Sequence, residues 1–127
     1  MRQTHTFLGV VVLVGTLAGC AGYGSSSSPS PTPVPVPAGA TAITIGAGAS
    51  TRTSTAYTPS PITVTAGATV AWTNTDSVPH TSTADGGAWN SGSIAPGRIF
   101  TRTFTSTGSF TYHCTIHPGM VGTVTVQ

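Results

Sequence analysis

The sequence predicts an all-β domain, built as an antiparallel Greek-key β-sandwich. Thr, Ser, Gly and Ala dominate the composition, and Val and Ile occur in short runs, which favours strands and turns over helices. Strand-like segments recur with Gly and Pro between them. No segment shows a sustained helical period, so helices that would connect parallel strands are not expected. Together these observations are typical of a sandwich of short strands.

Four segments supply the expected strands. They are, in chain order, residues 42–45 (AITI), 62–74 (ITVTAGATVAWTN), 97–114 (GRIFTRTFTSTGSFTYHC) and 122–127 (GTVTVQ). A turn at Ala66 and Gly67 divides the second segment, and Gly108 divides the third, so each of these two segments supplies two strands. Arg102 shares a face with two phenylalanines in a regular strand. Because burying an unpaired charge is costly, we expect Arg102 at a sheet edge with its head directed to water.

The N-terminus resembles the export signal of a bacterial lipoprotein. Arg2 is followed by an apolar run, residues 7–17 (FLGVVVLVGTL), that is too short to span a bilayer as a mature helix. The run leads into LAGC, which resembles a lipoprotein cleavage box ending at Cys20. We therefore expect residues 1–19 to be a lipoprotein signal peptide, rather than an ordinary signal peptide that happens to precede a cysteine. Cys20 is then the lipidated first residue of the mature chain.

A spacer separates this anchor from the domain. Residues 20–39 contain the lipidated cysteine and a Ser/Pro-rich linker without large apolar side chains other than scattered valines and one tyrosine. The proline-alternating part, residues 29–37, reaches about 28 Å at ~3.1 Å per residue in a polyproline II conformation. Residues 40–127 are the expected globular domain.

The charged residues exclude two classes of function. The chain has only four Lys and Arg residues and two acids, Asp76 and Asp85. A nucleic-acid-binding surface needs clustered Lys and Arg, so no nucleic acid partner is expected. The two aspartates show no paired-carboxylate arrangement for acid–base catalysis. Export implies an oxidising compartment, and lipidation of Cys20 leaves Cys114 as a lone thiol that should have a specific role.

The segment YHCTIHPGM, residues 112–120, indicates what that role is. It places Cys114, His117 and Met120 within seven residues, and His80 lies in a loop after the expected strand that contains Trp72. Two imidazoles, one thiolate and one thioether are the ligand set of a blue-copper electron-transfer site. Thiolate and imidazole suit both copper oxidation states, and the thioether favours Cu(I). Zinc also binds Cys and His but does not call for the methionine.

These motifs resemble the cupredoxins, specifically the branch of plastocyanin, pseudoazurin and amicyanin. The resemblance covers about residues 60–127 and rests on TNTDSVPHT, APGRIFTRTF and YHCTIHPGMVGTVTV. The Cys-x2-His-x2-Met spacing is similar to the short amicyanin-type loop. The resemblance implies one type 1 copper ion, with His80, Cys114 and His117 as strong ligands and Met120 as the weak axial ligand.

The residues next to two of the expected ligands, Thr81 after His80 and His113 before Cys114, also bear on the site. In the family an Asn commonly follows the first ligand histidine and ties the two ligand loops together, but this chain has Thr81 there. Thr81 and Ser82 are the candidate substitutes.

His113 alternates with Cys114 along the strand, so we expect it to point away from the metal. Taken singly, Cys114, Met120 and His80 could be a structural thiol, a core residue and a loop histidine. The joint spacing favours copper.

The function expected from this resemblance is one-electron transfer by a monomeric protein that is not an enzyme. It would be lipid-anchored to a bacterial membrane and face the periplasm or the cell exterior. Redox partner proteins would dock at an apolar surface around His117, with Ile116, Pro118, Val78 and Pro79 as its neighbours. Copper oxidases and nitrite reductases flank the cysteine with histidine on both sides, whereas Thr115 follows Cys114 here. The alternative left open is copper delivery, storage or resistance, which would use the same ligands.

Overall fold

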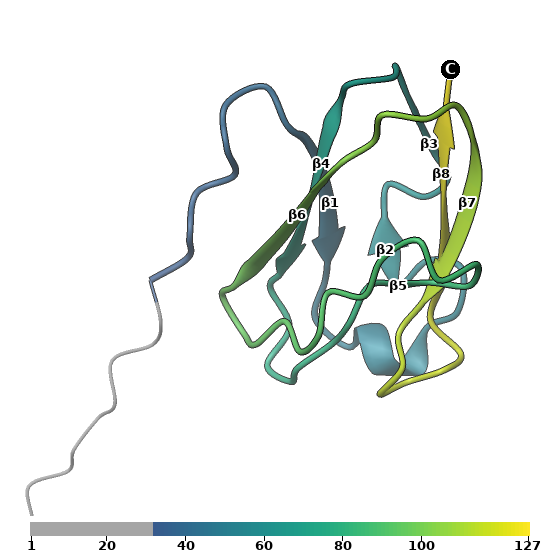
Figure 1. The fold of residues 1–127 in the computed structure, drawn as a ribbon. Coiled ribbons are helices and arrows are strands. Elements are labelled where there is room, and N and C mark those ends of the chain that lie inside the picture. The colour runs from purple at the N-terminus through teal and green to yellow at the C-terminus, as the bar shows by residue number, and fades with distance from the viewer. Residues whose placement is uncertain (1–31) are drawn as a thin grey trace, which may run out of the picture.

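Two four-stranded sheets pack against each other in the computed structural model, which describes residues 32–127 (Figure 1). The elements of this part of the chain are β1 (Thr41–Ile45), the 3-10 helix η1 (Ala49–Thr51), β2 (Tyr57–Thr58), β3 (Ile62–Val64), β4 (Thr69–Asn74), β5 (Thr83–Ala84), β6 (Ile99–Thr103), β7 (Gly108–His113) and β8 (Val121–Val126). The predicted β-sandwich is confirmed. The predicted signal peptide and Cys20 lie outside the described residues. None of the helices in the described part is long and apolar enough to cross a membrane.

The strand order is β2-β1-β4-β6 in one sheet and β3-β8-β7-β5 in the other. Most neighbours are antiparallel, as expected, but β1 pairs in parallel with β4, and β3 pairs in parallel with β8. In both parallel pairs the partners are distant in sequence, so no tight hairpin, which would require antiparallel strands, connects them. All four segments predicted from the sequence contain strands. The prediction missed β2 and β5, whose two residues each are too few to form an alternating pattern.

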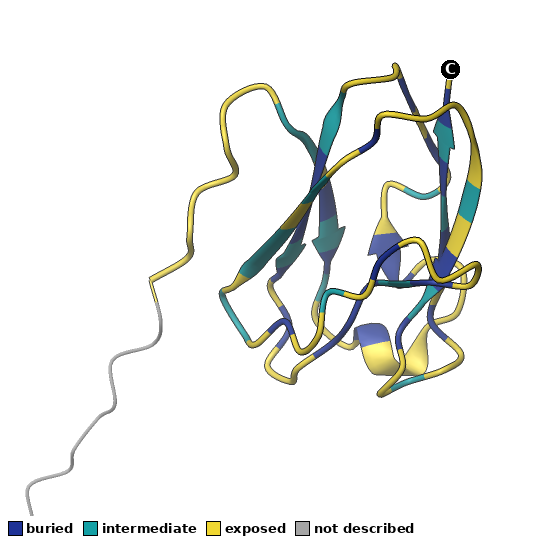
Figure 2. Cartoon of the chain, in the orientation of Figure 1, coloured by how far each residue is buried: buried dark blue, intermediate teal, exposed yellow. Residues whose placement is uncertain are grey.

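The core between the sheets is dominated by aromatic side chains. Buried residues lie along β1, β4 and β8, whereas most loop residues are exposed (Figure 2). Trp72 on β4 is fully buried, and its ring lies 5.6 Å from that of Tyr112 and 5.9 Å from that of Trp89. Because β7 carries Tyr112 and leads directly to Cys114, this packing fixes the position of the thiol relative to the opposite sheet.

Arg102 lies on β6, which is an edge strand as predicted. Its guanidinium carbon is 5.2 Å from the ring centroid of Trp89 and 5.5 Å from that of Phe104. The head is therefore not directed to water as expected: it lies against two aromatic faces, which stabilise the charge, while the side chain keeps partial contact with solvent.

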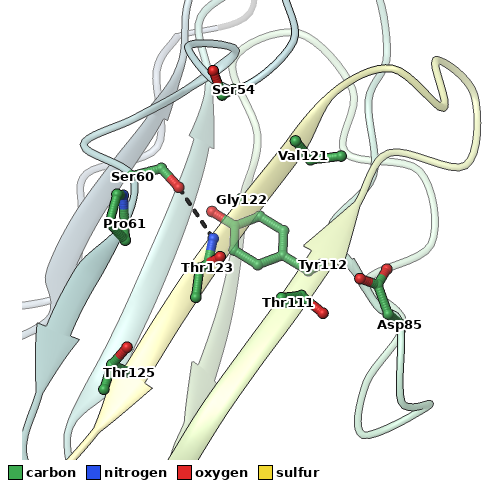
Figure 3. Close-up of a pocket in the computed structure, with 10 residues that line it drawn as sticks. All are labelled: Ser54, Ser60, Pro61, Asp85, Thr111, Tyr112, Val121, Gly122, Thr123 and Thr125. Atoms are coloured by element: carbon green, nitrogen blue, oxygen red, sulfur yellow. Dashed lines mark hydrogen bonds between the residues drawn. The ribbon is translucent and has the colours of Figure 1, made fainter.

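The position of the Tyr112 ring explains why residue 122 of the last strand is a glycine. The register of β7 and β8 places these residues opposite each other, and the Tyr112 ring lies across β8 at this point (Figure 3). A Cβ atom at position 122 would lie 2.3 Å from Cζ of Tyr112 and 2.4 Å from its hydroxyl oxygen. Only glycine leaves room for the ring, so this position couples β8 to the strand that carries Cys114.

Candidate metal centre

The predicted ligands come from two loops at one end of the sandwich. His80 follows β4, and its backbone exchanges two hydrogen bonds with Ile94, 3.2 Å from His80 N to Ile94 O and 2.7 Å in return. Cys114 follows β7, and Met120 directly precedes β8. Backbone bonds from Cys114 N to Met120 O (3.1 Å) and from Met120 N to His117 O (2.9 Å) close this short loop. The first loop is therefore held against the segment around Ile94, and the second loop is closed by its own backbone bonds.

Three side-chain donors converge between these loops. The Sγ atom of Cys114 lies 4.0 Å from Nδ1 of His80 and 3.8 Å from Nδ1 of His117, and the two Nδ1 atoms are 3.2 Å apart. The circumradius of a triangle with these sides is about 2.1 Å. Metal bonds to imidazole nitrogen and thiolate sulfur are about 2.0–2.3 Å long. The geometry of the three donors therefore fits a single metal ion.

The three donors differ in their access to solvent. His80 and Cys114 are fully buried, whereas His117 is partly exposed. Met120 is also fully buried, and its backbone bonds to Cys114 and His117 place it next to the cluster. Its role as a ligand stays a prediction. His113 is not part of the cluster. Its Nδ1 atom pairs with Oδ1 of Asp85 at 2.6 Å on the exposed side of the sheet.

Thr81 makes the contacts that join the two ligand loops. Its hydroxyl oxygen accepts a hydrogen bond of 2.8 Å from the backbone N–H of Thr115, and its own N–H lies 3.3 Å from Sγ of Cys114. An N–H directed at sulfur stabilises the thiolate form that binds metal. Ser82 turns elsewhere, because its hydroxyl accepts a bond from the indole N–H of Trp89. Of the two candidate substitutes for the usual Asn, the structure therefore selects Thr81.

Tyr57 holds the backbone of the loop that carries His80. Its hydroxyl donates to the backbone carbonyl of Thr81. Burial raises the pKa of Tyr57, and the nearby Cys114 and Tyr112 raise it further. The phenol therefore stays protonated and remains a hydrogen-bond donor in this position.

Asp76 is a neighbour of the cluster that sequence reasoning missed. Its Oδ2 atom lies 2.9 Å from Nε2 of His80, and the side chain is buried. Burial raises the pKa of Asp76, but hydrogen bonds from His80, Ser77 and Gly48 outweigh this effect and lower the pKa to about 2. The available signal was the position of one of only two acids four residues before the predicted first ligand.

The groove over β7 and β8 is not the metal centre. This groove has a volume of about 630 Å³ and is lined mainly by hydroxyl-bearing residues, with Asp85 at one side (Figure 3). None of its lining residues belongs to the cluster of His80, Cys114 and His117. The chemistry indicated by the sequence is therefore located in the buried cluster and not in an open pocket.

Comparisons with known proteins agree on a copper site. A family model described as copper binding proteins, plastocyanin/azurin family, matches residues 43–127. A solved structure, a novel purple cupredoxin from Nitrosopumilus maritimus, is 35% identical, with 68% of this chain and 99% of that chain covered and a TM-score of 0.63. An oxidised amicyanin mutant is 29% identical, with 78% and 95% covered and a TM-score of 0.61. A reduced amicyanin mutant is 27% identical, with 72% and 86% covered and a TM-score of 0.62.

Proposed function

The chain belongs to the plastocyanin/azurin family of copper-binding proteins, and on this premise we propose that it is a one-electron carrier with a single type 1 copper ion. His80, Cys114 and His117 would hold the ion through two imidazoles and a thiolate, and Met120 would add a weakly binding thioether. The observation that carries the proposal is the convergence of two Nδ1 atoms and one Sγ atom within 4.8 Å of one another in a largely buried site. This donor set is the one found in blue-copper electron-transfer sites.

A copper ion held by these residues would supply the redox chemistry, as the Cu(I)/Cu(II) couple. The chain supplies a rigid frame, because the ligand loops are fixed by β4, β7 and β8 and joined by the hydroxyl of Thr81. A frame that does not rearrange between the two oxidation states keeps the cost of electron transfer low. His117 is the ligand with partial exposure, so its ring edge is the natural exit for the electron.

The partner surface is an apolar patch around His117, formed by Val78, Pro79, Ile116 and Pro118. All four of these residues are exposed, and Ile116 has 46% of its surface accessible. Charge is scarce in the whole chain, so electrostatic steering is weak. The association rate with a redox partner should therefore change little between low and moderate salt. A steep dependence on ionic strength would contradict docking through the apolar patch.

The anchor is part of the same proposal. Lipidation of Cys20 would hold the carrier at a bacterial membrane, facing the periplasm or the cell exterior, with the proline-rich linker as spacer. The support is the LAGC sequence and the linker composition. Two or more acyl chains anchor a protein stably where one does not. Cys20→Ala should move the protein from the membrane fraction to the soluble fraction or block its processing. An unmodified, soluble wild type would refute the anchor.

The copper site is tested by adding Cu(II) to the purified chain and recording its visible spectrum before and after reduction with ascorbate. A thiolate–Cu(II) bond should give intense colour that ascorbate removes. Cys114→Ser should abolish the colour, whereas His113→Asn, which changes the neighbouring histidine outside the cluster, should keep it. Persistent colour in Cys114→Ser would rule out the site. Slow electron self-exchange combined with ready copper transfer to an acceptor protein would instead indicate copper delivery.

A further inference from the structure

Asp76 stands out because it is a buried carboxylate in direct contact with a predicted ligand. It lies in the loop between β4 and His80, with 6% of its side chain exposed, and its partner His80 is fully buried. The chain has only two acids, and the other one, Asp85, lies on the surface beside His113. Burying a charge is costly without compensating contacts, so the contacts of the Asp76 carboxylate should show what it does in the fold.

The carboxylate is held in one orientation by backbone donors. Its Oδ1 atom accepts from the N–H groups of Gly48 (3.2 Å) and Ser77 (2.8 Å), and its Oδ2 atom accepts from that of Ala49 (3.2 Å). The backbone N–H of Asp76 in turn donates to Oδ1 of Asn74 at 2.9 Å. The three bonds to the carboxylate hold the side chain in the orientation in which Oδ2 faces His80, and the fourth bond fixes the backbone of the same residue.

This contact determines which nitrogen of His80 can bind copper. A neutral imidazole has one N–H and one lone pair, and the carboxylate selects Nε2 as the site of the proton. The lone pair is then on Nδ1, which is the atom directed at Cys114 and His117. A carboxylate that accepts the remote N–H also makes the ligating nitrogen a stronger donor.

The second ligand histidine has no such partner. Within the described residues, the hydrogen-bond contacts of the His117 ring are to Cys114 and His80 only. The effect of a buried carboxylate therefore acts on one ligand, and its negative charge favours the more positive copper state, Cu(II), over Cu(I).

We propose that Asp76 is a positioning residue that orients His80 through Nε2 and biases the copper site toward Cu(II). The inference rests on the proposed copper ligation by His80, Cys114 and His117. The competing explanation is that Asp76 only anchors the segment around η1, because it also binds the N–H groups of Gly48 and Ala49. A purely structural role would alter the stability of the fold, but it would not weaken the binding of Cu(II) and of Cu(I) to different extents.

The test compares Asp76→Asn with the matched variant Asp85→Asn in the full copper-loaded chain. Both variants remove one carboxylate charge from an Asp–His pair, but only the first pair includes a predicted ligand. Affinities for Cu(II) and Cu(I) are measured by competition with chelators, and the reduction potential is measured by redox titration. Asp76→Asn should lose Cu(II) affinity by about 10–100-fold, as is typical for a group that supports a ligand. Its Cu(I) affinity should fall less.

Each factor of ten between the two losses raises the potential by ~59 mV for a one-electron couple. Asp85→Asn should keep the wild-type potential. Equal losses for Cu(II) and Cu(I) in Asp76→Asn, or a potential equal to that of Asp85→Asn, would overturn the proposal. If the wild-type chain binds copper and is coloured but Asp76→Asn has an unchanged potential, this inference alone fails. If the wild type shows no copper-dependent colour, the proposed function fails.

A second measurement covers the case in which Asp76→Asn does not fold. Nitrogen-15 NMR of the wild-type Cu(I) chain, labelled at histidine, should show a slowly exchanging Nε2–H for His80, shifted downfield by the carboxylate. The corresponding proton of His117 should exchange with water much faster. Equally fast exchange of the two protons would overturn the assigned role of Asp76.

Discussion

Replacing Thr81 by valine tests how this protein joins its two ligand loops. Valine has nearly the shape of threonine but lacks the hydroxyl, so the change removes the acceptor for the Thr115 N–H while keeping the packing. The bond is 2.8 Å long, and the Thr81 side chain is only 4% exposed. Thr115 directly follows Cys114, so the lost contact lies next to the thiolate ligand.

The expected cost follows from the surroundings of the bond. A hydrogen bond contributes about 0.5–1.5 kcal/mol net, and a donor left unpaired in a buried place costs about 1–3 kcal/mol. Because Thr115 itself is exposed, water can reach part of the freed N–H, and we expect a loss of about 1–2 kcal/mol. For a domain of this size each kcal/mol lowers Tm by about 4–8 °C.

The assay is thermal unfolding of the copper-loaded chain, together with the rate at which a chelator removes the copper. Thr81→Val should unfold at lower temperature and release copper faster, because the loop that carries Cys114 is less firmly held. Thr81→Ser is the matched control, since it keeps the hydroxyl, and it should lie close to wild type. If the serine variant is as unstable as the valine variant, the hydroxyl is not what joins the loops.

Three further predictions concern the axial ligand, the sheet packing and the response to acid. Met120→Gln should keep copper but lower the reduction potential in redox titration, because a hard oxygen ligand favours Cu(II) more than a thioether does; a raised potential would argue against axial binding. Gly122→Ala should cost about 1–3 kcal/mol of unfolding free energy through the clash with Tyr112, whereas Gly46→Ala, where nothing lies within 4 Å of the new Cβ, should cost far less in the same denaturant titration. Burial raises the pKa of Asp76, but bonds from His80, Ser77 and Gly48 lower it to about 2, below its unfolded value of ~3.9. Its contribution is therefore present above pH ~4 and lost as the pH falls toward ~2, so the copper-free wild type should lose more unfolding free energy over that range than Asp76→Asn; equal losses would contradict this.

The strands could be predicted from the sequence wherever alternation extended over several residues. The segments containing β1 and β8 show this pattern, because one face of each strand is buried against the opposite sheet. The two-residue strands β2 and β5 could not be predicted, since their pairing depends on the neighbouring strand rather than on their own residues. The parallel pairing of β1 with β4 likewise depends on how distant segments meet.

The sequence by itself determined the chemistry of the donors near the C-terminus. Cys114, His117 and Met120 are separated by so few residues that any short loop between two strands keeps them close together. Their residue types then indicate copper, because thiolate, imidazole and thioether together suit that metal. The edge position of Arg102 was also predictable, since its charge restricts where a strand with two phenylalanines can lie.

Only the tertiary structure decided how His80 joins that loop and which atom it presents. The Nδ1 atoms of His80 and His117 lie 3.2 Å apart although 37 positions separate them in the chain. The choice of Nδ1 depends on the carboxylate of Asp76 at Nε2, and the link between the loops depends on Thr81 and Thr115. Hydrogen bonds of this kind are selected by distance and direction in the folded chain, and residues that are remote in sequence meet those requirements only after the two sheets have packed.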